Sequence, residues 1–415
     1  MRLTLATLVA AAAALHAGCA GEPAPLDDAE VALPATAPVK IILDTDMASD
    51  CDDAGALGML HAFADNGEAQ IVGVMVSTGG DYGAPAADVI NTFYGRPDIP
   101  IGTTRRADFW IQKGTNPSQA YDYEVFNKHL AQNFPSSLRS GDDAPDAVQL
   151  YRQLLAQAAD QSVVIVTLGP LINVEQLLRS PADSFSSLAG VDLIKKKVKS
   201  LVVTGGNNPS GTSSNFSKED AEIYLSPLVQ GRPGDATTSW PGRIVWVGNN
   251  TGSSVNTGYS TNALPSSVHP IRKAYELFFK ANGGGPRRQS YDQAGVYIAV
   301  RGTSDGLFSL VETGYQTMAS VSAGETRWSA VSADPLGLPA GRRDHAYSTR
   351  VATTTSVAAA FQALMDQPPA STEPPAGGLD PDALVLEAEA AAGQPAFAPF
   401  RVVASATEGG GAYID

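Results

Sequence analysis

The fold is decided by the segment Lys40-Ile-Ile-Leu-Asp-Thr-Asp-Met-Ala-Ser-Asp-Cys-Asp-Asp-Ala-Gly-Ala-Leu57. Its apolar run at residues 41–43 predicts a buried strand, and residues 54–63 have the apolar spacing of a helix. Between the two lie five carboxylates within ten residues: Asp44, Asp46, Asp50, Asp52 and Asp53. In α/β proteins, ligand sites form where strands pass into helices. We therefore expect a ligand site at this aspartate turn.

Carboxylates this close together repel one another. They can all ionise at neutral pH only beside a positive charge or in good contact with water. Hard oxygen ligands at such a turn suit Ca²⁺ or Mg²⁺. The segment therefore predicts a divalent cation site, and a Ca²⁺-stabilised turn without catalysis stays open as an alternative.

From residue 39 onward, strand-like and helix-like segments alternate. Strands are expected at residues 40–44, 69–77, 162–167, 199–204 and 243–247, and helices at 53–65, 84–94, 147–159, 169–178, 218–228, 270–281 and 292–300. The strands are apolar throughout, which is typical of a sheet covered on both faces. The alternation predicts an α/β fold with an open, mainly parallel sheet flanked by helices. Its active site should lie at the carboxyl ends of the strands.

The first residues are typical of an export signal. Met1-Arg2 gives a positive start, and residues 3–15 form an apolar stretch that is too short to span a bilayer. Leu15-His-Ala-Gly-Cys19 resembles a bacterial lipoprotein signal, in which Cys19 is lipidated; an ordinary signal peptide is the alternative. We expect residues 1–19 to be the signal and residues 20–38 a flexible tether. The protein is then exported, either as a lipid-anchored periplasmic or cell-surface protein or in secreted form.

The composition of the chain limits the classes of molecule that it is expected to bind. The chain of 415 residues has a formal net charge of -15, so nucleic acid is not an expected partner, because phosphate binding needs clustered Lys and Arg. An acidic protein suits a divalent cation and a neutral, hydroxyl-rich ligand. Besides Cys19 the only cysteine is Cys51, which we interpret as a small filler and not a nucleophile, since the surrounding carboxylates raise its pKa. We expect no disulfide.

Further polar segments follow the other predicted strands. They are Thr167-Leu-Gly-Pro-Leu-Ile-Asn173, Thr204-Gly-Gly-Asn207, Asn215-Phe216 with Ala221-Glu222-Ile223, and Ser290-Tyr-Asp-Gln-Ala-Gly-Val296. Together with the aspartate turn, this ordered set resembles the inosine-uridine nucleoside hydrolase family over about residues 39–350. The segment Asn91-Thr-Phe-Tyr-Gly-Arg-Pro-Asp-Ile-Pro-Ile-Gly102 is similar to a secreted bacterial branch of that family.

The resemblance implies one bound Ca²⁺. Its ligands would be Asp46, Asp53, the backbone carbonyl of Leu168, and Asp292. The resemblance also implies that Asp46 takes the proton from a water on the metal, which then attacks the anomeric carbon of a ribosyl group. This agrees with general chemistry, because a cation lowers the pKa of its water and a nearby carboxylate can accept the proton. The implied reaction is hydrolysis of the N-glycosidic bond of a nucleoside or a related compound.

The resemblance also implies a set of substrate-binding residues. Those matching ribose-binding positions are Asp52, Asn215 and Glu222. The turn is two residues longer than usual, through Asp50-Cys51, so either Asp50 or Asp52 faces the ribose. Family members usually carry Asn at the positions of Asp81 and Tyr224. Asn207 is interpreted as a loop residue first and a ligand contact second.

The group that protonates the leaving base is a departure from the family. Many members place a His just before the late aspartate, and this chain has Tyr291. Tyrosine has a reference pKa of ~10, so it is a poorer proton donor at neutral pH. His345 could substitute if the fold returns it to the site; the alternative is a buried structural histidine.

Two other functions remain as alternatives. Asp44-Thr-Asp46 after a strand also occurs in haloacid-dehalogenase-type phosphatases, but those have Thr or Val where Ala48 stands, and no matching downstream motifs are found. The second alternative is a Ca²⁺-containing surface protein that binds a sugar without hydrolysing it. Family members are often dimers or tetramers, so a homo-oligomer is possible.

The chain changes character near residue 366. The main domain is expected at 39–365, a Pro-rich linker at 366–383 and a short β-rich C-terminal fragment at 384–415. Val385-Leu-Glu-Ala-Glu389 and Gly410-Gly-Ala-Tyr-Ile-Asp415 resemble the opening of a β-sandwich carbohydrate-binding module, in which residues such as Glu387 and Glu389 often hold a structural Ca²⁺. A sandwich domain needs ~100 residues, so this module would be truncated; chance similarity is the alternative.

Overall fold

The computed structural model describes residues 37–47, 50–105, 124–213, 215–216, 240–258, 266–283, 285, 287–320, 323–330 and 344–370. Contacts between residues divide the chain into two units, Met1–Ala370 and Ser371–Asp415, and every described residue belongs to the first. The predicted signal, the tether to residue 36, the helix at 218–228 and the fragment at 384–415 lie outside the described residues. The predicted domain limits and the C-terminal module therefore stay predictions.

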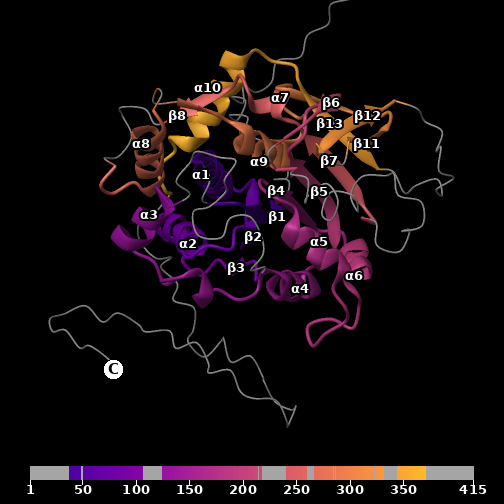
Figure 1. The fold of residues 1–415 in the computed structure, drawn as a ribbon, viewed down its shortest axis with the longest axis horizontal. Helices are drawn as coiled ribbons and strands as arrows, with labels where there is room; N and C mark the ends of the chain where they lie inside the picture. The colour runs from indigo at the N-terminus through magenta and orange to yellow at the C-terminus, as the bar shows by residue number, and fades with distance from the viewer. Residues whose placement is uncertain are drawn as a thin grey trace, which may run out of the picture. The chain divides into compact units, whose positions relative to one another are not determined.

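The centre of the fold is an eight-stranded sheet with the strand order β10-β13-β7-β5-β4-β1-β2-β3 (Figure 1). Every neighbouring pair is parallel except β10 and β13, which pair antiparallel at one edge. The strands are β1 (Val39–Thr45), β2 (Ala69–Val76), β3 (Ile101–Thr103), β4 (Val163–Thr167), β5 (Val198–Thr204), β7 (Arg243–Val247), β10 (Phe308–Val311) and β13 (His345–Arg350). This confirms the predicted open, mainly parallel sheet.

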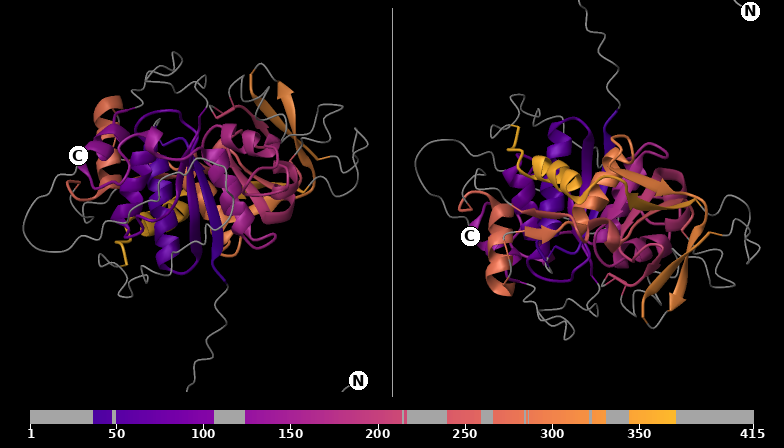
Figure 2. Two further views of the ribbon diagram at one scale, coloured as in Figure 1. Left: turned by 90° about the horizontal axis from the view of Figure 1, so that it is seen from below. Right: turned by 90° about the horizontal axis from the view of Figure 1, so that it is seen from above.

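Helices cover both faces of the sheet, as Figures 1 and 2 show. On one side lie α1 (Asp52–Asp65), α2 (Gly83–Phe93), α3 (Asn127–Asn133), α8 (Pro270–Asn282), α9 (Tyr291–Arg301) and α10 (Thr354–Met365), and on the other α4 (Ala147–Gln157), α5 (Ile172–Arg179) and α6 (Gly190–Lys197). Successive strand residues alternate between the two cores: Ile41 and Leu43 pack under the first helix layer and Ile42 under the second. Burial on both faces explains why these strands are apolar throughout.

Smaller elements complete the described part. A three-stranded sheet has the order β11-β12-β6, and a two-stranded sheet joins β8 to β9. Their bounds are β6 (Ser210–Gly211), β8 (Asn256–Gly258), β9 (Arg287–Gln289), β11 (Tyr315–Ser320) and β12 (Glu325–Ser329); a 3-10 turn at Gly141–Asp143 and the short helix α7 (Asn249–Gly252) add to them. β9 leads directly into α9, so it fixes where that helix begins.

One predicted helix starts later than expected. The helix predicted at 169–178 begins at Ile172, because Gly169 and Pro170 belong to the turn that leaves β4. This turn is part of the candidate site described below. Among the described residues, no helix is long and apolar enough to cross a membrane.

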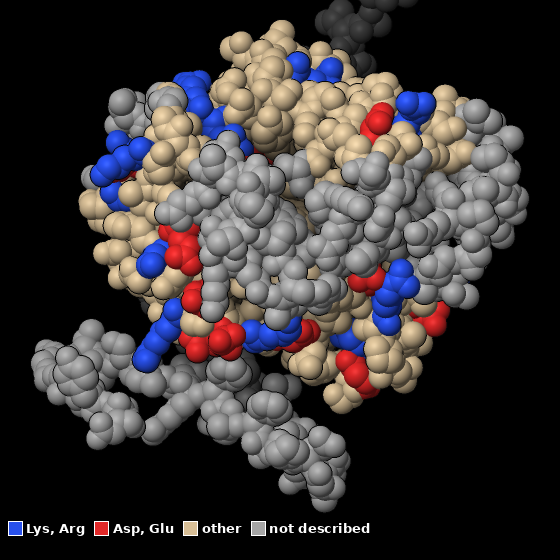
Figure 3. All heavy atoms as spheres, in the orientation of Figure 1, with Lys and Arg blue, Asp and Glu red and all other residues tan. Residues whose placement is uncertain are grey.

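Charged side chains on the face shown in Figure 3 lie in small groups of both signs along the edges of the described surface. The ion pairs include Arg105 with Asp142, at 3.4 Å between Nη1 and Oδ1, where the Asp142 side chain is 95% exposed. Exposed pairs of this kind contribute ~0–1 kcal/mol each. Stability must come mainly from the two cores.

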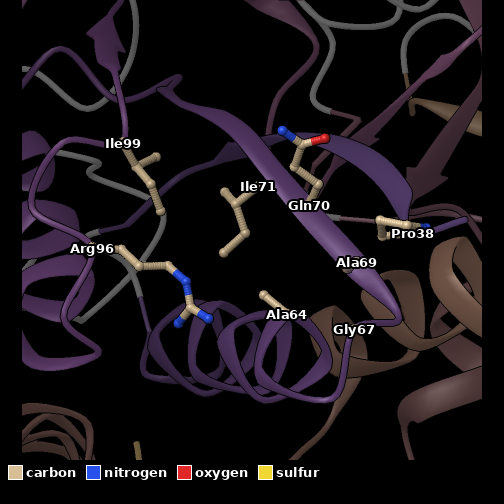
Figure 4. A pocket seen from close by; sticks show the side chains of 8 residues that line it. All are labelled: Pro38, Ala64, Gly67, Ala69, Gln70, Ile71, Arg96 and Ile99. Atoms are coloured by element: carbon tan, nitrogen blue, oxygen red, sulfur yellow. The ribbon is translucent and has the colours of Figure 1, made fainter. Parts of the chain in front are cut away.

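A shallow pocket of about 330 Å³ lies at the amino end of the sheet, far along β1 and β2 from the aspartate turn (Figure 4). Apolar side chains such as Ile71 and Ile99 line it together with Arg96. The Arg96 guanidinium binds Asp65 at 2.5 Å and lies 3.4 Å from Nδ1 of His61. The buried His61 ring also bonds Asn91 through Nε2 at 2.9 Å. These residues tie the end of α1 to the segment after α2.

This histidine should give the fold a measurable acid sensitivity. Burial and the Arg96 charge together lower the pKa of His61 from 6.5 to about 3, against the hydrogen bond with Asn91, which raises it. A depressed folded pKa gives stability that is full above about pH 6.5 and is lost as the pH falls toward 3. At about pH 5 the loss is ~2 kcal/mol. His61→Gln removes this contribution while leaving the opposite contribution of the buried aspartates in place, so its unfolding free energy relative to wild type should shift in its favour by ~2 kcal/mol between about pH 7.5 and 5, as measured by urea denaturation.

His129→Gln is the matched control, since that ring is partly exposed on α3. Its unfolding free energy relative to wild type should stay nearly the same at both pH values. If the difference between His61→Gln and wild type does not change on acidification, His61 is not the group that titrates.

Candidate functional site

The aspartates predicted to form a site come from two helix starts and one strand end. Asp46 follows β1, Asp52 and Asp53 form the first turn of α1, and Asp292 lies in the first turn of α9. Helix N-termini carry partial positive charge, so they stabilise carboxylates. The neighbouring strands β4 and β5 end at the same edge of the sheet as β1. The site therefore lies at the carboxyl ends of the parallel strands, as predicted.

Asp46 packs against the turn that follows β4. A Cβ atom built on Gly169 would stand 2.5 Å from Cγ of Asp46, so only glycine leaves room for this carboxylate. The Leu168 amide donates to the Asp44 carbonyl at 2.7 Å, which fixes the turn against β1. Asn215 closes the arrangement, since its Nδ2 donates to the carbonyls of Leu168 and, at 3.0 Å, of Thr204. Asp46, Leu168 and Asn215 are thus brought together.

Asp53 is buried, and only one of its two carboxylate oxygens has a hydrogen-bond partner among the described residues. The Thr45 hydroxyl donates to its Oδ1. Its Oδ2 is buried and has no hydrogen-bond partner among the described residues. A buried carboxylate oxygen without a partner costs free energy unless a ligand compensates it. The Oδ2 atom of Asp53 is therefore available to a cation.

Asp50, Asp52 and Asp292 form a triad in which one oxygen of each carboxylate lies within 4.8 Å of the other two. Arg288 on β9 reaches into this triad. Its Nη2 pairs with Asp50 Oδ2, and its Nε lies 3.2 Å from Asp52 Oδ1. The resemblance to a family did not point to this arginine.

The electrostatics of the cluster are dominated by burial. Burial raises the pKa of Asp292 well above 3.8, and the charges of the other carboxylates of the turn raise it further. The pKa values of Asp52 and Asp53 are raised for the same two reasons. The charge of Arg288 partly lowers the pKa of Asp52, and the hydrogen bond from Thr45 partly lowers that of Asp53. These carboxylates resist ionising together without a compensating positive charge.

The residues fit a hard divalent cation. The donor set is all oxygen, as Ca²⁺ and Mg²⁺ prefer. The open Oδ2 of Asp53 and the close spacing of the Asp50, Asp52 and Asp292 oxygens are independent signs of such a site. Asp50, Asp52 and Asp292 could therefore hold a metal ion; of these three only Asp292 is among the predicted metal ligands, so the predicted ligand set stays a prediction.

Other predicted residues lie at varying distance from this cluster. Tyr291 is the first residue of α9, with its ring 5.9 Å from the Arg288 guanidinium. Asp81 is exposed in the loop after β2. Asn207 follows β5, and its Oδ1 is buried without a partner among the described residues. Glu222 and Tyr224 lie outside the described residues. Their roles stay predictions.

The structure does not bring His345 to the aspartates. It is the first residue of β13, paired with Ile244, and so lies toward the amino end of the sheet. Three strands separate β13 from β1, a span of roughly 19 Å. Its Nδ1 accepts the Gln316 amide at 3.2 Å, and its ring packs edge-on against Trp246. These contacts match the alternative of a buried structural histidine.

Asp44 is a further buried acid beside the site. It accepts the Tyr151 hydroxyl at 2.9 Å and the Asn173 amide at 3.1 Å. Burial raises its pKa to about 7. Cys51 next to Asp52 is a buried free thiol, and burial raises its pKa well above 9.0, helped by the neighbouring carboxylates. Such a thiol is not activated as a nucleophile.

Comparison with known proteins supports the fold. A scan against protein-family models gave no match, and a search of curated proteins gave no significant relative. Among solved structures, the chain is similar to a plant nucleoside hydrolase, PpNRh1 (TM-score 0.52, 19% identity, covering 80% of this chain and 100% of that one). It is also similar to an inosine-guanosine nucleoside hydrolase (TM-score 0.54, 18% identity, 79% and 98%). A third similar structure is the type III effector protein XopQ complexed with adenosine diphosphate ribose (TM-score 0.50, 15% identity, 79% and 92%).

The chain therefore has the fold of the nucleoside hydrolases. At this level of identity, the likeness concerns the fold and not the activity. The preference for inosine and uridine in the name of the resembled family stays a prediction.

Cation binding should be visible in how stability depends on pH. The folded pKa values of Asp52, Asp53 and Asp292 lie above the usual 3.8. Stability from a raised pKa is full below the unfolded value and is lost as the pH rises. In EDTA, the unfolding free energy should therefore fall from about pH 4 to 8. Calcium at about 100 times its Kd should add ~2.7 kcal/mol at the upper pH, as measured by urea denaturation.

Asp292→Asn should abolish most of the calcium gain, whereas Asp192→Asn, exposed on α6, should keep it. Equal stability with and without calcium across this pH range would show that the cluster holds no cation.

Proposed function

We propose that this protein is a hydrolase that uses Ca²⁺ to cleave the N-glycosidic bond of a nucleoside or a related ribosyl compound. The observation that supports it most is the convergence of Asp46, Asp53, Asp292 and the Leu168 turn at the strand ends of a nucleoside hydrolase fold. XopQ in complex with adenosine diphosphate ribose gives further support for a ribosyl ligand on this fold.

Four groups would hold the ion: Asp46, Asp53, Asp292 and the backbone carbonyl of Leu168. When bound, Ca²⁺ would lower the pKa of a water and orient it for attack. Asp46 would accept the proton of the attacking water. It suits the role of general base because the Leu168-Gly169 turn holds its carboxylate at the inner wall of the site, where it is 5% exposed.

The carboxylates have a second role in the proposed reaction. Cleavage of a glycosidic bond passes through an oxocarbenium-like state with positive charge on the sugar. Fixed negative charge in a buried site stabilises that state without reorganisation. The Asp52 carboxylate and the amide oxygen of Asn215 accept hydrogen bonds from ribose hydroxyls, and Asn215 is oriented for this by its two bonds to the strand-end carbonyls.

Asp46→Asn should lower kcat on a cleaved nucleoside by about 10²–10⁴-fold, since it removes the general base. The measurement is release of base and reducing sugar from a panel of purine and pyrimidine nucleosides, with calcium or with EDTA. EDTA should abolish release by the wild type. Asp192→Asn should keep wild-type turnover.

The same nucleoside panel distinguishes the proposed hydrolase from the alternative, a protein that binds a sugar without hydrolysing it. Calcium-dependent binding of ribose or a nucleoside by calorimetry, with no base released from any member, would replace the hydrolase by a sugar-binding surface protein. Undiminished turnover by Asp46→Asn would show that Asp46 is not the general base.

Tyr291 is proposed to protonate the leaving base. Burial raises its pKa above 10.0, and the charges of Asp52, Asp50 and Asp292 act in the same direction, against Arg288. The hydroxyl is therefore protonated at neutral pH and a weak donor. Tyr291→Phe should slow inosine cleavage by about tenfold or more and leave p-nitrophenyl riboside cleavage nearly unchanged, because that leaving group needs no proton. Equal effects on both substrates would show that Tyr291 only packs against the site.

A further inference from the structure

Arg288 is held in place by backbone and by aromatic rings. It lies on β9 opposite Thr257 of β8, and the following Ser290 amide donates to the Val255 carbonyl at 2.9 Å. Its guanidinium stands 5.2 Å from the Phe278 ring centre and 5.9 Å from that of Tyr291. Contacts of a cation with ring faces stabilise its position. The charge of Arg288 is therefore fixed at the edge of the acidic cluster.

The contacts of this charge are with two carboxylates of one turn. Nη2 pairs with Asp50 and Nε with Asp52, at 3.2 Å for the second. The Arg288 side chain is 17% exposed and that of Asp52 2%, so these charges are poorly screened by water. One oxygen of each carboxylate is thereby occupied.

The same carboxylates have the geometry of a cation site. One oxygen of each of them and one of Asp292 lie within 4.8 Å of one another. Two ligands on opposite sides of a Ca²⁺ ion stand about 4.6–5.2 Å apart, twice the usual Ca–O distance. The triad is thus close enough to share an ion. The Oδ2 atom of Asp53 is buried and has no partner among the described residues, and the charges of Asp46, Asp50 and Asp52 act on this carboxylate.

We propose that Arg288 is a positioning residue that takes the place of a second cation in this cluster and so limits the site to one metal ion, held by Asp46, Asp53 and Asp292. The inference rests on the metal-dependent function proposed above. Asp50 belongs to the longer turn, and its added negative charge is matched by this one guanidinium. Asp52 is then held away from the metal by its contact with Arg288.

The test is calcium titration of the full chain by isothermal titration calorimetry. The wild type should bind one ion. Arg288→Met should bind two, because the Asp50 and Asp52 oxygens that pair with Arg288 become free to hold the second ion, next to the Asp292 carboxylate that the two ions would share. Arg287→Met removes the same charge from an exposed neighbour on β9 and should still bind one. One ion bound by Arg288→Met at wild-type affinity, or none bound by the wild type, overturns the proposal.

A second pair of variants covers the case in which Arg288→Met does not fold. Asp50→Asn leaves Arg288 with one partner and excess positive charge near the ion, so it should bind calcium more weakly than the double variant Asp50→Asn with Arg288→Met. Equal affinities overturn the proposal. Nucleoside cleavage is not read in either titration, so a protein that hydrolyses nothing can still show the change from one ion to two.

Discussion

Repulsion among buried aspartates is the constraint on which this structure depends. The turn after β1 gathers carboxylates of which Asp52 and Asp53 are almost without exposure, and Asp292 joins them from α9. Such a cluster is costly unless positive charge lies within it. The chain supplies part of that charge itself, through two helix N-termini and Arg288. The negative charge that these groups do not compensate would favour a bound cation.

The backbone around the cluster is shaped by the need to bring these groups together. Parallel strands place all their carboxyl ends at one edge, so β1 and β4 deliver Asp46 and the Leu168 turn to the same point. Glycine at 169 allows the close approach of Asp46. Behind them, Asp44 is bonded by Tyr151 of α4 and Asn173 of α5, which joins the second helix layer to the site. The site and the core are therefore parts of one packing arrangement.

The sequence predicts the centre of this fold better than its edges. Strands such as β1 and β4 are apolar runs because both faces are buried, and that signal is strong. β3 is three residues long, and β13 mixes polar and apolar residues in His345-Ala-Tyr-Ser-Thr-Arg350, so neither was predicted. Both lie away from the middle of the sheet. The position of His345 followed from pairing with β7, which no local pattern reveals.

The site shows the same division between local and distant signals. The aspartates of one turn are adjacent in sequence, so their clustering could be predicted, whereas Arg288 is 236 residues from Asp52. The only hint was a pair of cations, Arg287 and Arg288, just before the late aspartate of an acidic chain. The longer turn and this arginine compensate each other in charge. Asp50 adds one negative charge and Arg288 one positive charge, so the net charge offered to a cation is that of a site with neither. Because a guanidinium is tethered to β9 and cannot dissociate, this compensation persists whether or not a metal ion is bound.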